Sequence, residues 1–444
     1  MSYRNLKLAL LACSGAAVLL AASTAANAGG FALREQSAYG QGSSYAGVAA
    51  GGSLSSMFWN PATITQMPGI QSETVLTGII PNSSNSASGG TLAALGGSGN
   101  IAHSALVPSS YYSWQFNQKL WLGLSVNAPY GLTETFPDVW AGRDYGAGGS
   151  HLTTYNATPT IAYAINNWLS VGAGVQIQYA DATLTKGFGA TPTWQTSIDG
   201  AGWGYGFTAG VTVTPTPTTS IGLGYRSAVN QKLNGTLSVP TAVAAFSTPG
   251  SVNTTINLPD IVSLGLRQKI TSQWTGMATV EWSNWSRIGT SAILQPNGAP
   301  ALVFNGVAPV AATIPFQYKD GWFFSLGAEY QWNPQLALRA GIAYEQSPIT
   351  DQVRIPILAD NDRTWLSIGA SYQMTAKLGL DFAYSHLFVK STPINVIAGN
   401  PNFNGAVTYT GTVNSQIDII SVALKYRWDD PAPAPTKVGY YKAK

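Results

Sequence analysis

Apolar and polar residues alternate along much of this chain with a period of two. Between residues 335 and 345, one set of alternate positions is small or polar, while the other is Leu336, Leu338, Ala340, Ile342 and Tyr344. The same alternation recurs over 273–283, 377–385 and 420–428. Successive side chains of a β-strand point to opposite faces, so each segment is predicted to be a strand with one apolar face.

Turn signals divide the predicted strands in a regular way. Short connections stand near residues 117–118, 166–167, 214–219, 270–272, 333–334 and 374–376. Long stretches rich in Gly, Ser, Asn and Pro lie between them, roughly at 81–103, 131–150, 182–198, 232–256, 287–315, 346–362 and 388–412. Six short turns and seven long loops separate 14 antiparallel strands, with the turns expected in the periplasm and the loops outside the cell. Most strands reach about 10 residues, against a common length of about 5 to 6, as expected of strands that cross a bilayer.

The low charge content places these strands in a membrane. Only 9% of residues are charged, against about 25% in typical soluble domains. Beyond residue 28 there is no uninterrupted apolar run of about 18 residues, which a transmembrane helix would need. A soluble β-sandwich also has alternating strands, but its solvent face would carry more charge than this. We therefore predict an all-β fold, a 14-stranded antiparallel transmembrane β-barrel in a Gram-negative outer membrane, with its apolar face towards outer-membrane lipid.

The first 28 residues have the composition of a secretory signal peptide. Two basic residues precede an apolar run over 8–22, and small residues at 26–28 provide a cleavage site. Cys13 is the only cysteine, so the exported chain is expected to contain no disulfide. Removal of residues 1–28 leaves 20 basic against 19 acidic residues, and this balance gives no indication of a nucleic-acid partner.

Residues 29–68 precede the first predicted strand and are rich in Gly, Ser and Ala. A barrel of 14 strands is wider than the barrel of about 8 strands that interior side chains can fill. We therefore predict that residues 29–68 form a plug in the lumen and that residues 69–428 form the barrel. Inside the plug, "SMFWNPATITQMPG" is expected to form a stiff elbow, because Pro61 fixes one backbone angle and Asn60 can bond neighbouring backbone. The alternative is a plain turn with a few buried side chains.

Several blocks of the sequence have a familiar form. "GGFALREQSAYGQGSSYAGVAAGGSLSSMFWNPATI", with its Asn-Pro-Ala triplet, resembles the amino-terminal hatch of the long-chain fatty acid transporter family of bacterial outer membranes. "NAPYGLTETF", "NLPDIVSLGLRQKI", "EWSNWS", "LRAGIAYEQSPI" and "DNDRTWLSIGASYQM" look like recurring blocks of the same family. The resemblance extends up to Trp428 and is strongest in the hatch and around Arg363.

The resemblance implies a transport route. Apolar substrates would be captured outside, passed to an inner pocket, and released sideways through a gap in the barrel wall. Phe31 aligns with a hatch phenylalanine that reaches the ligand pocket, and the expected substrate-binding and hatch residues are Phe31, Phe58, Asn60, Pro61 and Ala62. The resemblance also places an inward kink and lateral opening at Pro129, Tyr130 and Gly131. The alternative is that the third strand simply ends at Asn127.

Basic residues are the candidates for contact with a carboxylate head group, because a guanidinium suits bidentate carboxylate binding. Those near strands and loop bases are Arg226, Arg267, Lys319, Arg339, Arg354 and Arg363, of which we select Lys319, Arg354 and Arg363 as possible head-group contacts. Arg363 has Asp360 and Asp362 beside it, so it could serve only a structural ion pair. Asp181 stands where some fatty acid transporters carry a basic residue, which favours an uncharged hydrocarbon over a fatty acid.

A stretch of alternating glycines, "GWGYGF", places Gly202, Gly204 and Gly206 on one face of a strand and three aromatic rings on the other. Glycines on the lumen face would let another backbone, such as the plug, come close. A lining that merely makes room explains them equally well.

The sequence carries no pattern that indicates an enzyme. Its three histidines, His103, His151 and His386, are scattered, no G-x-S-x-G motif occurs, and no cluster has metal-ligand spacing. We predict a passive outer-membrane transporter for hydrophobic small molecules, with long-chain fatty acids as the first choice, aromatic hydrocarbons as the alternative, and no cofactor. A general porin or a surface adhesin barrel is a further alternative. We expect a monomer with a Pro-rich periplasmic tail at 429–444.

Overall fold

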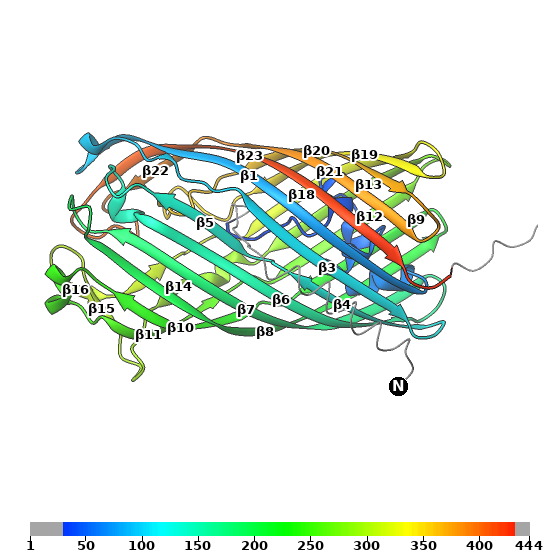
Figure 1. Ribbon diagram of the computed structural model, residues 1–444, viewed down its shortest axis with the longest axis horizontal. Helices are drawn as coiled ribbons and strands as arrows, with labels where there is room; N and C mark the ends of the chain where they lie inside the picture. The colour runs from blue at the N-terminus through cyan, green and yellow to red at the C-terminus, as the bar shows by residue number, and fades with distance from the viewer. Residues whose placement is uncertain (1–29, 431–444) are drawn as a thin grey trace, which may run out of the picture.

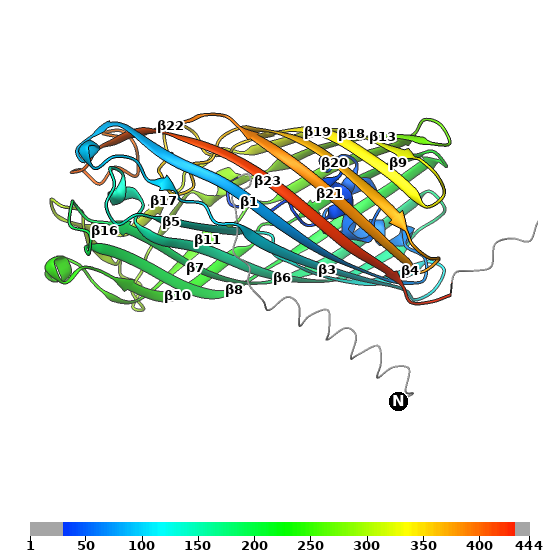
Figure 2. The same ribbon diagram turned by 45° about the horizontal axis from the view of Figure 1, so that its top comes forward.

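The computed structural model describes residues 30–430, so the predicted signal peptide and all but the first two residues of the predicted tail lie outside the described residues. Strands dominate the described chain, and the main sheet closes on itself. Closure joins β1 (Ile70–Gly90) to β23 (Tyr409–Arg427), which pair from Gln71↔Arg427 to Gly90↔Tyr409. Figures 1 and 2 show these two strands side by side in the wall.

The chain crosses the wall 14 times, which confirms the predicted 14-stranded antiparallel barrel. Ten crossings are single strands: β1, β3 (Ala105–Gln115), β6 (Gly148–Ala164), β7 (Leu169–Gly187), β8 (Gln195–Thr216), β13 (Trp274–Ser283), β18 (Gly321–Gln331), β19 (Leu336–Gln346), β20 (Arg363–Gln373) and β23. Four crossings are interrupted and consist of two strands each: β4 (Leu120–Asn127) with β5 (Gly131–Phe136), β9 (Thr219–Arg226) with β10 (Asn230–Ser238), β11 (Gly250–Asn257) with β12 (Ile261–Lys269), and β21 (Leu378–Val389) with β22 (Thr392–Val396).

Several strands continue into stretches that the turn signals had marked as loops. β1 includes "PNSSNSASGG" at 81–90, although Ser, Asn and Gly are poor strand formers. These residues pair with β23 nearly to its start, because an existing neighbour ladder outweighs local preference. The remaining loops hold short elements: β2 (Gly99–Asn100), β14 (Thr290–Ala292), β15 (Leu302–Phe304), β16 (Pro309–Ala311), β17 (Thr313–Pro315), η5 (Ala93–Leu95), η6 (Arg143–Tyr145), η7 (Thr241–Phe246) and η8 (Trp285–Ile288).

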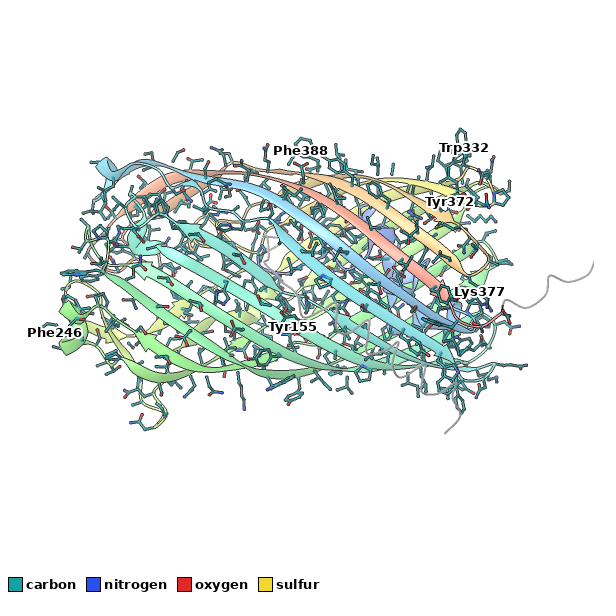
Figure 3. The ribbon with its side chains drawn as sticks, in the orientation of Figure 1. Tyr155, Phe246, Trp332, Tyr372, Lys377 and Phe388 are labelled. Atoms are coloured by element: carbon teal, nitrogen blue, oxygen red, sulfur yellow. The ribbon has the colours of Figure 1, made fainter. Side chains whose placement is uncertain are left out.

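The predicted alternation corresponds to two different faces of the wall. On β19, Leu338 and Ile342 are exposed, whereas Arg339 and Glu345 are buried towards the lumen. Aromatic side chains lie near the rims, and Figure 3 shows Trp332 and Tyr372 at one end of the barrel. No helix of the described chain has the length and apolar character needed to span a membrane. The strands therefore present an apolar outer face, as expected for a barrel in lipid.

Residues 30–68 lie inside the barrel and are almost entirely buried. They form α2 (Ala38–Gln41) and three 3-10 helices, η2 (Val48–Ala50), η3 (Leu54–Phe58) and η4 (Pro61–Gln66). η4 packs on β6, β7 and β8, η2 packs on β9 and β12, and α2 packs on β20 and β21. Figures 1 and 2 place these helices near the end of the barrel that carries the short turns. Residues 37–67 are called the plug body below.

Wall glycines allow the plug body to approach the strands at backbone contact. A Cβ added to Gly222 would overlap the carbonyl oxygen of Ala49, and one added to Gly224 would overlap that of Trp59. Wall glycines at which an added Cβ would overlap the plug body are called the glycine seat: Gly172, Gly210, Gly222, Gly224, Gly265, Gly341 and Gly369. At Gly210 the overlapped atoms belong to the side chains of Asn60 and Pro61, and at the others they include backbone atoms. Some are cross-strand neighbours, such as Gly222↔Gly265 and Gly210↔Gly224. Only glycine fits where two backbones lie this close.

The glycines of "GWGYGF" have a different neighbour from the one we considered. Gly202, Gly204 and Gly206 face residues 227–232, which are the connection between β9 and β10 together with the first residues of β10, and not the plug. The crossing formed by β9 and β10 is interrupted here, and residues 227–232 lie inward, against the glycine face of β8. On the other face of β8, Trp203, Tyr205 and Phe207 are exposed, as predicted.

Candidate functional site

The third crossing of the wall is interrupted at residues 128–130, which we call the wall break. β4 ends at Asn127 and β5 begins at Gly131. β3 pairs with β4 only from Ser110 onwards, so residues 105–109 of β3 have no strand partner on that side within the described chain. Pro129 has no backbone donor, which weakens the ladder at this point. The predicted kink residues thus stand at a real interruption of the sheet.

An extended segment, residues 31–36, covers the wall break from the lumen side and is called the arm. Ala32 and Tyr130 form an isolated antiparallel bridge. The Leu33 amide donates to the Pro129 carbonyl at 2.8 Å, and the Gly131 amide donates to the Phe31 carbonyl at 2.9 Å. The arm therefore supplies hydrogen bonds that a neighbouring strand would otherwise supply.

The side chain of Gln36 fills the remaining polar positions at the wall break. Its amide nitrogen donates to the carbonyl of Ala128 at 2.8 Å, and its amide oxygen accepts from Ser109 at 2.7 Å and from Asn127 at 3.2 Å. The Tyr111 hydroxyl donates to the Gln36 backbone carbonyl at 2.6 Å. Gln36 is fully buried, so these bonds satisfy polar groups on both edges of the wall break without water.

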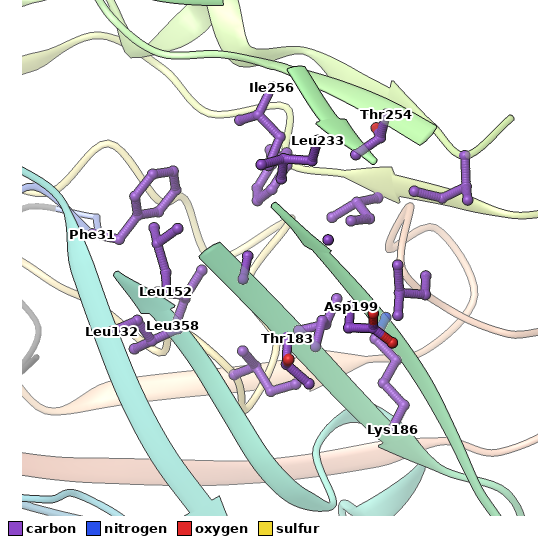
Figure 4. Close-up of a pocket in the computed structure, with 18 of the residues that line it drawn as sticks. Phe31, Leu132, Leu152, Thr183, Lys186, Asp199, Leu233, Thr254, Ile256 and Leu358 are labelled. Atoms are coloured by element: carbon purple, nitrogen blue, oxygen red, sulfur yellow. The ribbon is translucent and has the colours of Figure 1, made fainter. Parts of the chain in front are cut away.

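An apolar cavity of ≈ 120 Å³, called the outer cavity, lies on the extracellular side of the arm. Its lining includes Phe31, Leu132, Leu152, Leu233, Ile256, Val353 and Leu358. Figure 4 shows Phe31, Leu132, Leu152 and Leu358 at one end of this cavity and Lys186 at the other. Among residues 30–430 no hydrogen-bond acceptor or ion-pair partner of the Lys186 ammonium is found. The outer cavity thus combines a long apolar wall with polar side chains that include Lys186, Asp199 and His151.

Lys186 also lines a groove that opens towards the extracellular loops, the entrance groove, with a volume of ≈ 430 Å³. Its walls include Phe188 and Phe304, whose ring centres are 5.8 Å apart. Asp144 lies at this groove, and burial raises the pKa of its carboxyl to about 6. The Gly189 amide and the Asn404 side chain each donate to Asp144 at 3.3 Å, which opposes that shift.

A second, smaller cavity of ≈ 50 Å³, the inner cavity, lies on the other side of the arm. It is lined by Leu33, Arg34, Phe58, Trp59, Pro129, Tyr130, Arg226, Glu281, Trp285 and Phe323 among others. The Phe31 ring contacts Trp285 at 4.9 Å and Tyr130 at 6.0 Å between ring centres. Phe31 lines the outer cavity while these two partners shape the inner one, so the Phe31 ring stands between the two spaces.

Ion pairs attach the arm to the wall. Arg34 pairs with Glu281 on β13 at 2.8 Å and with Glu345 on β19 at 3.4 Å. The guanidinium carbon of Arg34 also lies 3.7 Å from the ring centre of Phe323. These contacts hold the middle of the arm, whereas Phe31 at its start is held by ring contacts and by one backbone hydrogen bond, from the Gly131 amide.

The basic residues selected as head-group contacts occupy three different environments. Lys319 is exposed and lines neither cavity. Arg354 is buried, pairs with Asp351 and donates to the carbonyls of Asp360 and Ile349 at 3.0 Å. Arg363 pairs with Asp360 and lies 3.7 Å from Glu345. Two of the three are therefore engaged in structural ion pairs, and their role in binding cargo stays a prediction.

The Asn-Pro-Ala triplet locks the plug body to the wall. The Asn60 side-chain nitrogen donates to the carbonyl of Ala49 at 2.7 Å and to that of Val211, on β8, at 2.9 Å. Its oxygen accepts from the Ala62 amide at 3.0 Å and so caps η4, with Pro61 at the first helical position. All three residues lie away from both cavities, and their part in substrate passage stays a prediction.

Lys186 is not among the head-group contacts predicted from the sequence. Ala180, Ala182 and Leu184 precede it at alternate positions of one strand, so the pattern itself placed Lys186 on the same face. A single cation that follows three apolar residues on this face was the available signal. Whether Lys186 has an ion-pair partner depends on which residues fold against it, and the sequence pattern does not give this.

Comparison with known proteins identifies the family. Residues 19–428 match the model of the family described as outer membrane protein transport protein (OMPP1/FadL/TodX). The chain is 28% identical over 418 residues to outer membrane protein P1 of Haemophilus influenzae, covering 84% of this chain and 88% of that protein. It is 27% identical over 425 residues to the long-chain fatty acid transport protein of Escherichia coli K12, covering 84% and 91%.

Solved structures show the same fold. A Pseudomonas aeruginosa FadL homologue aligns with a TM-score of 0.81 at 21% identity, covering 90% of this chain and 100% of that one. The Ralstonia pickettii toluene transporter TbuX aligns with a TM-score of 0.63 at 19% identity, covering 88% and 97%. The chain is therefore an outer-membrane β-barrel that belongs to the OMPP1/FadL/TodX family of transport proteins for hydrophobic molecules.

Proposed function

We propose that this protein admits long-chain fatty acids through the outer membrane by diffusion, without a cofactor. The cargo enters at the entrance groove, settles in the outer cavity, displaces the arm, and leaves sideways at the wall break. The observation that carries this proposal is the outer cavity itself, which has a long apolar wall and, at its extracellular end, a Lys186 ammonium with no ion-pair partner among residues 30–430, although Asp199 also lines that end.

The lining of the outer cavity suits an alkyl chain with an anionic end. Burial of alkyl carbon contributes about 0.8 kcal/mol per methylene, so the apolar wall favours a long chain over a short one. A partly buried ammonium without an acceptor gains a charge-assisted hydrogen bond from a carboxylate. Asp181 does not oppose this, since its side chain is 52% exposed and pairs with His151 at 3.0 Å.

The wall break provides the proposed exit. The arm is the element that completes the hydrogen bonding there, through two backbone bonds and the Gln36 side chain. Movement of the arm alone would expose both edges of the break and connect the two cavities. The plug body need not move, and its contacts with the glycine seat resist movement.

Aromatic hydrocarbons are the second candidate cargo, since toluene transporters share this fold. An uncharged ring would use the apolar lining but would gain nothing from Lys186. The choice between fatty acids and aromatic hydrocarbons is tested by uptake of labelled oleate and of labelled toluene. Cells with the gene are compared with cells that lack it. Loss of oleate entry alone supports a fatty acid carrier, and loss of toluene entry alone supports the alternative. Unchanged entry of both would leave a general porin or an adhesin as the remaining functions.

Substitution Lys186→Gln is expected to lower oleate uptake about 10-fold while leaving oleyl alcohol uptake unchanged, because one charge-assisted hydrogen bond is lost. The measurement compares initial uptake rates of the two labelled compounds. Lys232→Gln is the matched control, since Lys232 is an exposed lysine outside the lining of both cavities. An equal loss for both compounds would mean that Lys186 only shapes the outer cavity.

A further inference from the structure

Arg226 is a buried cation whose hydrogen-bond partners among residues 30–430 are all neutral. It ends β9, its exposed fraction is 5%, and it lines the inner cavity. One N–H donates to the carbonyl of Phe58 at 3.1 Å, and another donates to the side-chain oxygen of Gln176. The guanidinium carbon lies 4.2 Å from the ring centre of Phe58. No carboxylate of the described chain lies within ion-pair distance of it.

The other buried or partly buried arginines of the arm and the wall strands, among residues 30–430, have carboxylate partners. Arg34 pairs with Glu281, and Arg339 pairs with Glu329 at 2.9 Å. Glu281, which also lines the inner cavity, is already engaged by Arg34 and by the Ser263 hydroxyl at 2.5 Å. Burial of a charge is costly unless the charge is paired. Arg226 is therefore the lumen arginine at which an incoming anion would gain most.

The chemistry of Arg226 fits a carboxylate. A guanidinium has five N–H donors, and only two of those of Arg226 have an acceptor in the part of the chain that the structure describes. The remaining donors can bind a carboxylate in the two-pronged geometry that arginine favours. The rings of Phe58 and Trp59 beside it offer an apolar surface to the first carbons of the chain.

Arg226 also lies on the proposed route of the cargo. The inner cavity that it lines is bounded by Leu33 of the arm on one side and by Pro129 and Tyr130 of the wall break on another. Lys186 stands in the outer cavity, beyond the Phe31 ring. The two cations thus lie in the two successive spaces along the proposed route.

We infer that Arg226 forms a second carboxylate-binding site, which receives the head group of the cargo after the arm has moved and before lateral release. This inference rests on the proposed function and narrows it to anionic lipids. The handover from Lys186 to Arg226 keeps the carboxylate paired while the alkyl chain turns towards the wall break. A hydrocarbon would pass through both spaces without engaging either cation.

The test uses purified full-length protein in detergent and equilibrium binding of oleate and of oleyl alcohol, which differ only in the head group. Arg226→Gln is expected to weaken oleate binding about 10-fold or more and to leave oleyl alcohol binding unchanged. Arg226→Lys keeps the positive charge but lacks the paired N–H donors of the guanidinium. This variant is expected to retain part of the preference for oleate over oleyl alcohol. Arg427→Gln is the matched control, because Arg427 lies at the end of β23 and pairs with Asp429. Each variant is first checked for a folded, heat-modifiable barrel on a gel.

The outcomes separate the inference from the proposed function. An unchanged ratio of oleate to alcohol binding in Arg226→Gln, or an equal loss for both ligands, overturns the site and leaves fatty acid transport intact. Failure of the parent protein to take up oleate overturns the proposed function instead. If Arg226→Gln does not fold, binding of oleate and of oleyl alcohol is compared in the Lys186→Gln protein. A remaining preference for oleate over oleyl alcohol supports the Arg226 site, and complete loss of that preference contradicts it.

Discussion

Oxidation of a variant carrying Ala32→Cys and Tyr130→Cys is expected to lower oleate uptake about 10-fold, because it removes the open state of the arm on which uptake depends. The two residues face each other in an antiparallel bridge, where Cα atoms stand about 4.5–5.5 Å apart, within the range that a disulfide spans. The exported chain is expected to have no cysteine of its own, so no other disulfide should form. Labelled oleate uptake is measured before and after addition of a reductant, which should restore it.

A disulfide elsewhere in the plug distinguishes movement of the arm from movement of the whole plug. Ser44 in the plug body and Ser367 on β20 have their hydroxyl oxygens 2.7 Å apart, so Ser44→Cys with Ser367→Cys is the matched pair. Oxidation of this pair is expected to leave uptake unchanged, because the plug body stays in its seat during transport. Loss of uptake with this second disulfide would mean that the whole plug moves. Full oleate uptake with the disulfide between positions 32 and 130 would show that transport does not require movement of the arm.

Substitution of Gly222→Ala together with Gly224→Ala is expected to unseat the plug body. The added methyl groups would overlap the carbonyl oxygens of Ala49 and Trp59 in the plug body. Overpacking of this kind costs about 1–3 kcal/mol per site. The wall should still close while the lumen opens, so ionic conductance across planar bilayers should rise from near zero to that of an open pore.

Gly78→Ala is the matched control for this experiment. Gly78 also lies in a wall strand, and the nearest neighbour of an added Cβ is 3.9 Å away, an ordinary contact. This variant is expected to conduct no more than the parent. A double variant that stays non-conducting, with an unchanged unfolding temperature, would show that the plug tolerates the extra volume and that the glycine seat is not needed for closure.

Local pattern was a reliable guide to the wall. Alternation placed Leu338 and Ile342 outside and Arg339 and Glu345 inside, and the structure agrees at each position. The alternation is regular because one face of every strand contacts lipid, whereas the other faces a polar, tightly filled lumen. The ends of strands were less predictable, since the Ser- and Gly-rich end of β1 is held as a strand only by its pairing with β23.

The candidate site was only partly visible in the sequence. Phe31 and Phe58 do line cavities, and Pro129 and Tyr130 do stand at an interruption of the wall. The roles of the cations could not be assigned in the same way. Whether Arg363 or Arg226 is free to bind cargo depends on which carboxylates fold against it, and those carboxylates come from strands far away along the chain.

The sequence by itself determined that this chain is a lipid-facing barrel, because the period-two pattern and the scarcity of charge leave few other ways to cover the apolar surface and pair every backbone group. The tertiary structure alone decided where the plug touches the wall and which cations remain unpaired. Both depend on the register between strands that are distant in sequence, and that register is set by closure of the whole barrel and not by any local run of residues.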